Sequence, residues 1–208
     1  NNPDAVIVAA GCYVQAAEKE MAEKNMADIL VGNNKKKDIA QILEEYFAVK
    51  EEEQQVPLVS EVIDINHTKE YEDLTIHKVN EHTRAYIKIQ DGCNQFCSYC
   101  IIPYTRGRIR SKNPEEVIEE VKNLAAQGYK EIVLTGIHLS SYGKDLGDIT
   151  LLDVIQRIQQ IEDIERIRLG SLEPRIITEQ FVKELRACDK VCPHFHLSLQ
   201  SGCDETLK

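Results

Sequence analysis

Apolar residues gather in short blocks along the first fifty positions, and these blocks predict alternating strands and helices. An unbroken apolar run covers residues 5–10, and a second run, ADILVGN, covers 27–33. Short runs bounded by turn residues are typical of buried strands. Residues 18–24 have the pattern of a short helix, and apolar residues at helical spacing predict a second helix over 35–47. Because strand and helix alternate, we expect part of a parallel α/β sheet.

The alternation becomes regular after residue 84 and predicts a barrel-like arrangement. Strands are expected over 85–93, 130–136, 165–171 and 194–202, and helices over 113–128, 150–161 and 178–188. Asn113 and Pro114 are residue types that favour a helix N-cap and a first helical position. Repeated β–α units of this length predict a barrel, whose chemistry lies at the C-terminal ends of the strands. Four units do not close a barrel, so we expect a partial one.

The polar stretch between these two patterns predicts a domain boundary. It carries EEEQQVP and one short alternation, SEVIDIN, which favour a linker with some extended structure. We therefore expect an α/β part over 1–49, a linker over 50–83 and a partial barrel over 84–208. Since the chain opens directly on a predicted buried strand and ends on the pattern of a first helical turn, we expect a fragment of a longer protein.

Composition and charge exclude several classes of protein. The chain has 208 residues, of which 42% are hydrophobic and 29% charged, so global disorder is not expected. No stretch approaches the roughly 20 apolar residues of a membrane span, and no secretory signal is recognisable. The net charge of −10 argues against a dedicated nucleic-acid binder but permits RNA contacts in another module. Seven cysteines, an odd number with several clustered, predict a reducing, cytoplasmic setting and metal ligation.

Three of these cysteines, Cys93, Cys97 and Cys100, lie in the stretch CNQFCSYC, directly after a predicted strand. A structural zinc site normally has four protein ligands, and ferredoxin clusters likewise use four cysteines. Three thiolates at this spacing can each hold one iron of a cubane cluster, which leaves the fourth iron open to a substrate. A zinc site completed by a distant cysteine is the alternative interpretation.

This spacing, with Tyr99 before the last cysteine, resembles that of radical S-adenosylmethionine enzymes. The stretches IKIQDGCNQFCSYCIIPYTRGRIRSK, KEIVLTGIHLSSYG, RLGSLEP and HFHLSLQSGCDETLK resemble the radical methylthiotransferase family over essentially all of 84–208. Upstream, VIVAAGCYVQ resembles the end of that family's N-terminal domain, usually written G-C-Y-A-Q, from which Val14 departs. The resemblance implies an α/β fold, a partial radical-SAM (β/α) barrel preceded by the C-terminal part of a parallel α/β methylthiotransferase domain.

The cofactors follow from the resemblance. It implies that Cys93, Cys97 and Cys100 hold a 4Fe-4S cluster whose open iron is chelated by S-adenosyl-L-methionine. An electron from the cluster, supplied by a donor such as flavodoxin or ferredoxin, then splits the sulfonium to give a 5′-deoxyadenosyl radical. Cys12 matches one ligand of a second 4Fe-4S cluster that donates sulfur, so two clusters are expected in the full-length protein. The other two ligands would lie before residue 1, and we do not expect the family's RNA-binding TRAM domain within these 208 residues.

The resemblance also suggests a substrate. TGIHLSSYG and RGRIRS look most like the branch that methylthiolates N6-threonylcarbamoyladenosine beside the anticodon of tRNA. Methylthiolation of isopentenyladenosine tRNA or of a ribosomal protein remains an alternative, as does a non-catalytic iron–sulfur or zinc module. We expect a polar substrate rim and a basic stripe for the anticodon stem-loop phosphates. The rim residues are His138, Ser140, Ser141 and Tyr142, and the stripe residues are Arg106, Arg108 and Arg110.

Further residues are cofactor-binding candidates by the same resemblance. Gly136 matches the position where the backbone approaches the methionine amine, with a plain strand-to-loop turn as the alternative. Glu173 follows a strand and is suited to accept from ribose hydroxyls, unless it is only a surface acid. Ser198 and Gln200 share one face of the predicted fourth strand, and Tyr99 is placed to pack beside the adenine. The remaining cysteines, Cys188, Cys192 and Cys203, are expected to be structural or unligated thiols, and His194 and His196 stay unassigned.

Overall fold

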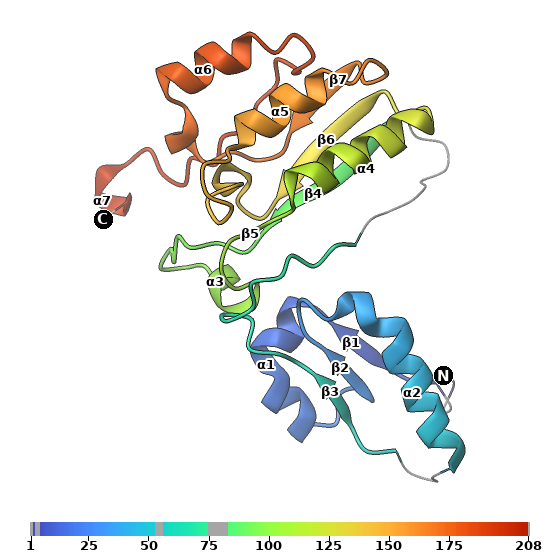
Figure 1. Cartoon of the computed structure of the whole chain (residues 1–208). Helices are drawn as coiled ribbons and strands as arrows, with labels where there is room; N and C mark the ends of the chain where they lie inside the picture. Colours follow the sequence, from blue (N-terminus) through green and yellow to red (C-terminus); the bar gives the residue numbers. More distant parts are fainter. Residues whose placement is uncertain (1, 3–4, 53–55, 75–82, 208) are drawn as a thin grey trace. The chain divides into compact units, whose positions relative to one another are not determined.

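The computed structural model describes residues 2, 5–52, 56–74 and 83–207, and the chain divides into two compact units (Figure 1). One unit comprises Asn1–Leu74 and Asn94–Arg108, and the other comprises Thr75–Cys93 and Ile109–Lys208. The cysteine-rich stretch therefore lies at a unit boundary, because Cys93 closes a segment of the second unit and residue 94 opens a segment of the first.

The first unit is built on a three-stranded parallel sheet in the order β1-β2-β3. The strands are β1 (Val8–Ala10), β2 (Ile29–Val31) and β3 (Val59–Glu61); the helices are α1 (Cys12–Glu23), η1 (Lys36–Asp38), α2 (Ile39–Glu52) and α3 (Ile102–Thr105). Side chains alternate across the central strand: Ile29 and Val31 pack with the α2 residues, whereas Leu30 packs with the α1 residues. The sheet is thus covered by one helix on each face, as parallel sheets require.

The second unit holds a four-stranded sheet in the order β5-β4-β6-β7. Its strands are β4 (Arg84–Asp91), β5 (Arg110–Ser111), β6 (Glu131–Gly136) and β7 (Arg166–Leu169); its helices are α4 (Pro114–Ala126), η2 (Leu139–Ser141), α5 (Leu151–Gln159), η3 (Pro174–Ile176), α6 (Glu179–Arg186) and α7 (Asp204–Leu207). β4, β6 and β7 are parallel, and β5 runs antiparallel to β4. In Figure 1 the helices α4 and α5 lie along this sheet. The arrangement confirms the predicted α/β class with a partial barrel.

Local sequence explains where the helices of this unit begin. Asn113 caps α4 by accepting from the Glu115 N–H at 2.9 Å, as its residue type predicted. Thr150 and Asp153 form a reciprocal capping box at the start of α5. Thr178 accepts from the Phe181 N–H at 3.1 Å at the start of α6. Each helix then buries an apolar stripe against the strands, in one core that includes Ile87, Ile132, Leu134, Val154 and Ile167.

Two expectations from the sequence differ from the structure. The stretch predicted as a fourth strand, 194–202, forms no strand among the described residues; Ile167 and Leu172 make single parallel bridges to Val191 and Leu197. The intervening residues leave the ladder around Pro193, which has no N–H to donate. The stretch expected as a linker contains β3, which pairs with β2 and completes the first sheet. The chain passes from the first unit to the second between Leu74 and Thr75, within the stretch 50–83.

The helices found in the described parts of the chain are all too short or too polar to cross a membrane.

One buried carboxylate joins three strands of the second unit. Glu131 opens the central strand β6, and its ladder neighbours are Arg84 on β4 and Arg166 on β7. Its oxygens lie 2.7 Å from Arg84 Nε, 3.1 Å from Arg166 Nε and 3.0 Å from Arg168 Nε. Burial raises the pKa of the Glu131 carboxyl, but hydrogen bonds from these three guanidinium groups outweigh it and lower the pKa below its ordinary value.

We expect Glu131→Gln to lower the free energy of unfolding by about 1–3 kcal/mol at neutral pH, because three arginines lose their shared charge partner. The folded pKa is depressed, so the carboxylate's contribution is present above the unfolded value of about 4.3 and is lost as pH falls through the folded value. Chemical denaturation between pH 7 and pH 3 measures both effects. Glu119→Gln, an exposed position on α4, is the matched control and should change stability by less than about 0.5 kcal/mol. Equal curves for the two variants would contradict the stabilising role.

Candidate functional site

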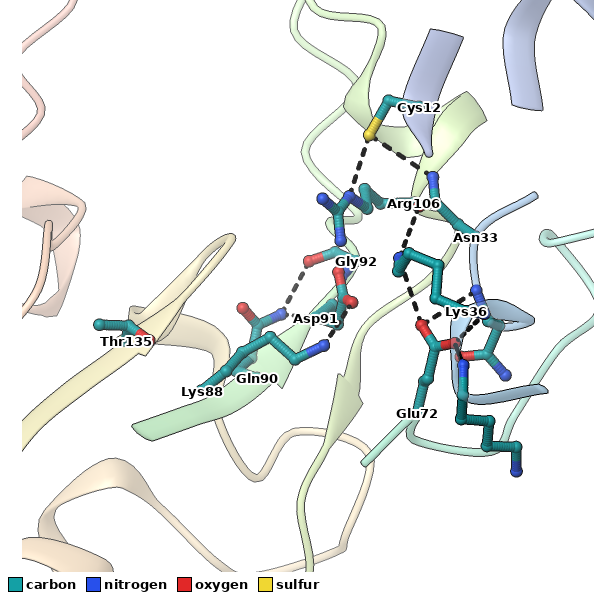
Figure 2. Close-up of polar contacts among 12 residues, drawn as sticks. Cys12, Asn33, Lys36, Glu72, Lys88, Gln90, Asp91, Gly92, Arg106 and Thr135 are labelled. Atoms are coloured by element: carbon teal, nitrogen blue, oxygen red, sulfur yellow. Dashed lines mark hydrogen bonds and ion pairs between the residues drawn. The ribbon is translucent and has the colours of Figure 1, made fainter. Parts of the chain in front are cut away.

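Cys93, the first cysteine of CNQFCSYC, follows the end of β4, which is held by hydrogen bonds within the second unit. Gln90 is fully buried, and its Nε2 donates to the carbonyls of Asp91 and Gly92 at 2.8 and 2.7 Å. The Asp91 carboxylate accepts from the Gly92 N–H at 2.8 Å and from Lys88 Nζ at 3.1 Å (Figure 2). Gly92 has a φ of 73°, which favours glycine, and the buried Cys93 comes next. These bonds hold the backbone from which Cys93 projects.

Gln90 also joins this strand end to the neighbouring strand. Its Oε1 accepts from the His138 N–H at 2.6 Å. Gly136 is its ladder partner on β6, and a Cβ at Gly136 would lie 2.9 Å from both Cβ and Oε1 of Gln90. The close approach expected for Gly136 is therefore made to Gln90, which gives this glycine a packing role of its own. Its role toward a cofactor stays a prediction.

The other two cysteines of the stretch lie in the first unit. Cys97 is exposed, Cys100 is half-buried, and the Cys100 N–H donates to the Cys97 carbonyl at 2.9 Å. Phe96 has a φ of 50°, an uncommon value for a large side chain. Its ring meets Tyr104 edge to face at 5.5 Å and carries the Arg108 guanidinium at 4.5 Å, contacts that stabilise this conformation. Tyr99 is 70% exposed, so its ring is available to a ligand.

The chemistry of the donor set suits an iron–sulfur cluster. All seven cysteines are thiols outside any disulfide, and Cys93, Cys97 and Cys100 supply three sulfur ligands on one short stretch. Within the described residues, no three His, Cys, Asp or Glu side chains are already gathered around one metal position. The proposal of an iron–sulfur cluster therefore rests on the three cysteines and their spacing in the sequence, and not on a metal site already formed in the described part of the structure.

Cys12 lies apart from this stretch in the sequence and has polar neighbours of its own in the first unit. It opens α1 after Gly11, whose φ of 110° favours glycine. Asn33 Nδ2 lies 3.5 Å and Arg106 Nε 3.1 Å from its Sγ (Figure 2). Burial raises the pKa of the Cys12 thiol, but the hydrogen bonds from Asn33 and Arg106 and the positive charge of Arg106 lower it below its ordinary value. Such a sulfur is suited to bind metal as a thiolate.

The three arginines of the expected basic stripe differ in their surroundings. Arg110 lies on β5 and is only 1% exposed, so it is not accessible to an RNA phosphate. Arg106 is directed to the Cys12 sulfur, and Arg108 lies on the Phe96 ring. The burial of Arg110 does not favour a phosphate contact by this residue, because alternating charge in a sequence does not reveal which side chains become buried. The RNA-binding role of the three arginines stays a prediction.

The expected polar rim is also partly buried. Tyr142 is buried, its hydroxyl donates to the Lys112 carbonyl at 2.7 Å, and burial raises its pKa. Ser141 is buried, with its Oγ 2.6 Å from His138 Nδ1, and Ser140 Oγ accepts from the Glu173 N–H at 2.8 Å. These residues mainly build the loop after β6. His138 differs, because no described residue bonds its buried Nε2, and burial lowers the pKa of this imidazole.

The remaining cofactor candidates are bonded to different neighbours. Glu173 is half-buried, and its carboxylate accepts from Arg175 Nε. Ser198 is half-buried and its N–H donates to the Leu172 carbonyl at 2.8 Å, whereas Gln200 is exposed. The sequence reasoning missed Gln90 and Asn33, although both are polar residues beside buried strands, in IKIQDGC and DILVGN. The position of Gln90 in a predicted strand, three residues before Cys93, is a signal that could have found it, whereas the sequence around Asn33 does not indicate Cys12 as a neighbour.

Gly136→Ala should destabilise the chain by about 1–3 kcal/mol, because the added methyl group overlaps the buried Gln90 side chain. Thermal unfolding measures the loss. Gly202→Ala is the matched control, since a Cβ there meets nothing within 4 Å and no left-handed φ is involved. If both variants unfold at the parent temperature, β4 and β6 are not in the close contact described.

Comparison with known proteins finds a matching family model and relatives that are similar over the whole chain. Residues 87–208 match the family model of the Radical SAM superfamily. The chain is 39% identical over 207 residues to threonylcarbamoyladenosine tRNA methylthiotransferase MtaB of Aquifex aeolicus, covering 100% of this chain and 49% of that protein. It is 37% identical over 213 residues to tRNA-2-methylthio-N(6)-dimethylallyladenosine synthase of Clostridium botulinum (strain Loch Maree / Type A3), covering 100% of this chain and 45% of that protein. The chain thus spans about half the length of the curated relatives it matches.

A solved structure shares the fold. The radical S-adenosylmethionine methyltransferase TsrM from Kitasatospora setae superposes with a TM-score of 0.65 over 98% of this chain and 43% of that chain. The two are 17% identical in sequence, so the likeness concerns the fold alone.

Proposed function

We propose a function on one established premise: this chain belongs to the radical SAM superfamily, whose family model matches residues 87–208. The proposed activity is methylthiolation of N6-threonylcarbamoyladenosine next to the anticodon of tRNA, carried out by a full-length enzyme. The observation that carries the proposal is the three-thiol stretch that begins two residues beyond the end of β4. The resemblance to methylthiotransferases along the entire chain supports it.

Cys93, Cys97 and Cys100 would hold a 4Fe-4S cluster, with one iron left for S-adenosyl-L-methionine. When bound, this pair supplies the radical chemistry that activates a C–H bond. The chain's contribution is to position the ligands: the Gln90 and Asp91 bonds hold the backbone before Cys93. The Phe96 ring contacts hold the loop before Cys97.

Cys12 would be one ligand of a second 4Fe-4S cluster that provides sulfur. Its hydrogen bonds from Asn33 and Arg106 favour the thiolate that ligation needs. The other ligands, the electron donor and a second S-adenosyl-L-methionine for the methyl group belong to the proposal for the full-length enzyme. We propose that it acts in the cytoplasm, where tRNA is its partner.

The cofactor-binding roles are proposed residue by residue. Gly136 would let the cofactor's amine approach the end of β6, and Glu173 would accept from its ribose. Ser198 and Gln200 would contact it from the segment bridged to Leu172, and Tyr99 would pack beside its adenine. The exposed ring of Tyr99 and the half-buried Glu173 support these roles.

The choice between the two tRNA substrates rests on the loop after β6. A polar threonylcarbamoyl group needs hydrogen-bonding partners, whereas a dimethylallyl group favours an apolar pocket. His138 is the residue of this loop with an unused ring nitrogen among the described residues, and it supports the polar substrate. The similar identities to both kinds of relative, 39% and 37%, keep the dimethylallyladenosine substrate as the second candidate.

Cys97→Ala should abolish both cluster assembly at this site and formation of 5′-deoxyadenosine, because two protein thiolates do not retain a cubane. Iron and sulfide analysis after anaerobic reconstitution, followed by a cofactor-cleavage assay, measures the effect. Cys203→Ala removes an exposed thiol outside the proposed site and should keep parent values. A zinc or non-catalytic module predicts no cofactor cleavage by the parent protein. A Cys97 variant with full iron and parent cleavage would refute the ligand assignment.

The full-length enzyme should methylthiolate tRNA bearing threonylcarbamoyladenosine in preference to tRNA bearing dimethylallyladenosine, because His138 in the loop after β6 offers a hydrogen-bonding partner to a polar group. Mass analysis of nucleosides from a mixture of the two tRNAs measures the ratio. His138→Leu should reduce the preference severalfold while cofactor cleavage continues. Equal turnover of the two tRNAs by the parent enzyme would overturn the substrate assignment and leave the radical chemistry in place.

A further inference from the structure

Asn33 is a polar neighbour of Cys12 with several hydrogen bonds, and it is only 1% exposed. Its Nδ2 lies 2.6 Å from the Thr105 carbonyl and 3.5 Å from the Cys12 sulfur. Its Oδ1 accepts from Lys36 Nζ at 2.9 Å, and its backbone N–H donates to Gln15 Oε1 at 2.9 Å. One buried amide therefore contacts the cysteine of α1 and the segment 94–108, which carries Cys97 and Cys100.

The partners dictate which way this amide faces. A lysine ammonium has only donors, so Lys36 must meet the amide oxygen. The Thr105 carbonyl has only lone pairs, so it must meet the amide nitrogen. With the oxygen held by Lys36, both N–H groups of Asn33 are directed to Thr105 and Cys12. A reversed amide would place an oxygen against two acceptors and a hydrogen-bearing nitrogen against an ammonium.

Lys36 is held in turn by a buried acid. Glu72 is 1% exposed, and its Oε2 lies 3.2 Å from Lys36 Nζ. Its carboxylate also accepts from the backbone N–H of Lys36 at 2.6 Å (Figure 2). The backbone N–H groups of Asn34 and Lys37 donate to it as well, each at 3.2 Å. A buried carboxylate with an ion pair and three N–H donors fixes the loop that carries Asn33 and Lys36.

We propose that Glu72, Lys36 and Asn33 form a polar relay that positions Asn33 as a donor to the Cys12 sulfur and as an anchor for the 94–108 segment. Glu72 and Lys36 act through Asn33, so all three are positioning residues. Arg106 provides the second donor to the same sulfur and comes from the anchored segment itself. Loss of the anchor would therefore also displace this second donor.

The relay has a chemical consequence, which rests on the proposed role of Cys12 as a cluster ligand. Hydrogen bonds to a ligating thiolate stabilise the more negative, reduced cluster and raise its reduction potential. Asn33 and Arg106 would thus set the potential of the Cys12-bound cluster, and Lys36 and Glu72 would set it through Asn33. The Asn33–Thr105 and Arg106–Cys12 hydrogen bonds also hold the segment 94–108, which carries Cys97 and Cys100, to the sheet and helices of the first unit.

The anchoring half is tested on this chain without any cluster. Hydrogen–deuterium exchange resolved to peptides over 101–108 should accelerate severalfold in Asn33→Ala, Lys36→Met and Glu72→Gln, because the Thr105 carbonyl loses its positioned donor. Lys35→Met is the matched control, because Lys35 is a neighbouring lysine of the same loop whose ion pairs, at 3.5–3.6 Å, are with Glu61 and Asp38. Thermal unfolding confirms that each variant is folded. Exchange in Lys36→Met no faster than in Lys35→Met would overturn the relay.

The electrostatic half is tested on the reconstituted full-length protein. A spectroscopic redox titration should show a lower midpoint potential for the Cys12-bound cluster in Asn33→Ala, and a smaller shift of the same sign in Lys36→Met. If Lys36 acts through Asn33, the double variant should match Asn33→Ala alone, whereas fully additive shifts would contradict the relay. Cys12→Ala separates the hypotheses. Unchanged iron content in that variant would refute Cys12 as a ligand, while lost iron with unshifted potentials in the other variants would refute only this inference.

Discussion

Parallel pairing of β4 with β6 is the constraint on which the second unit depends. It brings the ends of two strands to one edge of the sheet, where Gly136 lies opposite Gln90 and leaves room for its buried side chain. Through that side chain the backbone before Cys93 and the start of the loop after β6 are bonded together. At the opposite edge Glu131 binds arginines of both neighbouring strands, so the sheet is held by polar contacts at each end.

Two buried carboxylates, Glu131 and Glu72, hold parts of the backbone together in this protein. Glu131 and Glu72 each gather several donors, and each holds separate backbone segments in a fixed relation. Removing such a partner would leave unpaired donors in a water-poor place, which costs more than the loss of a surface pair. These two acids are therefore structural, although the residue type alone would suggest solvated surface.

The first unit shows how one short strand organises a candidate metal ligand. Alternation along β2 directs Leu30 toward α1 and its two neighbours toward α2, so the strand runs between the two helices. Gly32 then permits close approach, because a Cβ there would lie 3.2 Å from Val62 Cα. Asn33 follows at once and is carried next to Cys12. Packing of three apolar residues thus places the amide that contacts the sulfur.

The sequence by itself determined the class of the fold, most of the helices and strands, and the thiol donors. These features depend on local periodicity, on caps such as Asn113 and on short-range spacing such as that of Cys93, Cys97 and Cys100, all of which can be read within one segment. Tertiary structure decided the rest. Arg110 became buried, Tyr142 turned its hydroxyl to a backbone carbonyl, and β3 joined a sheet from within a predicted linker. The network of Glu72, Lys36 and Asn33 likewise joins residues far apart in the chain. Such partners are chosen by packing and by the need to satisfy buried polar groups, and neither is written in the local pattern of residues.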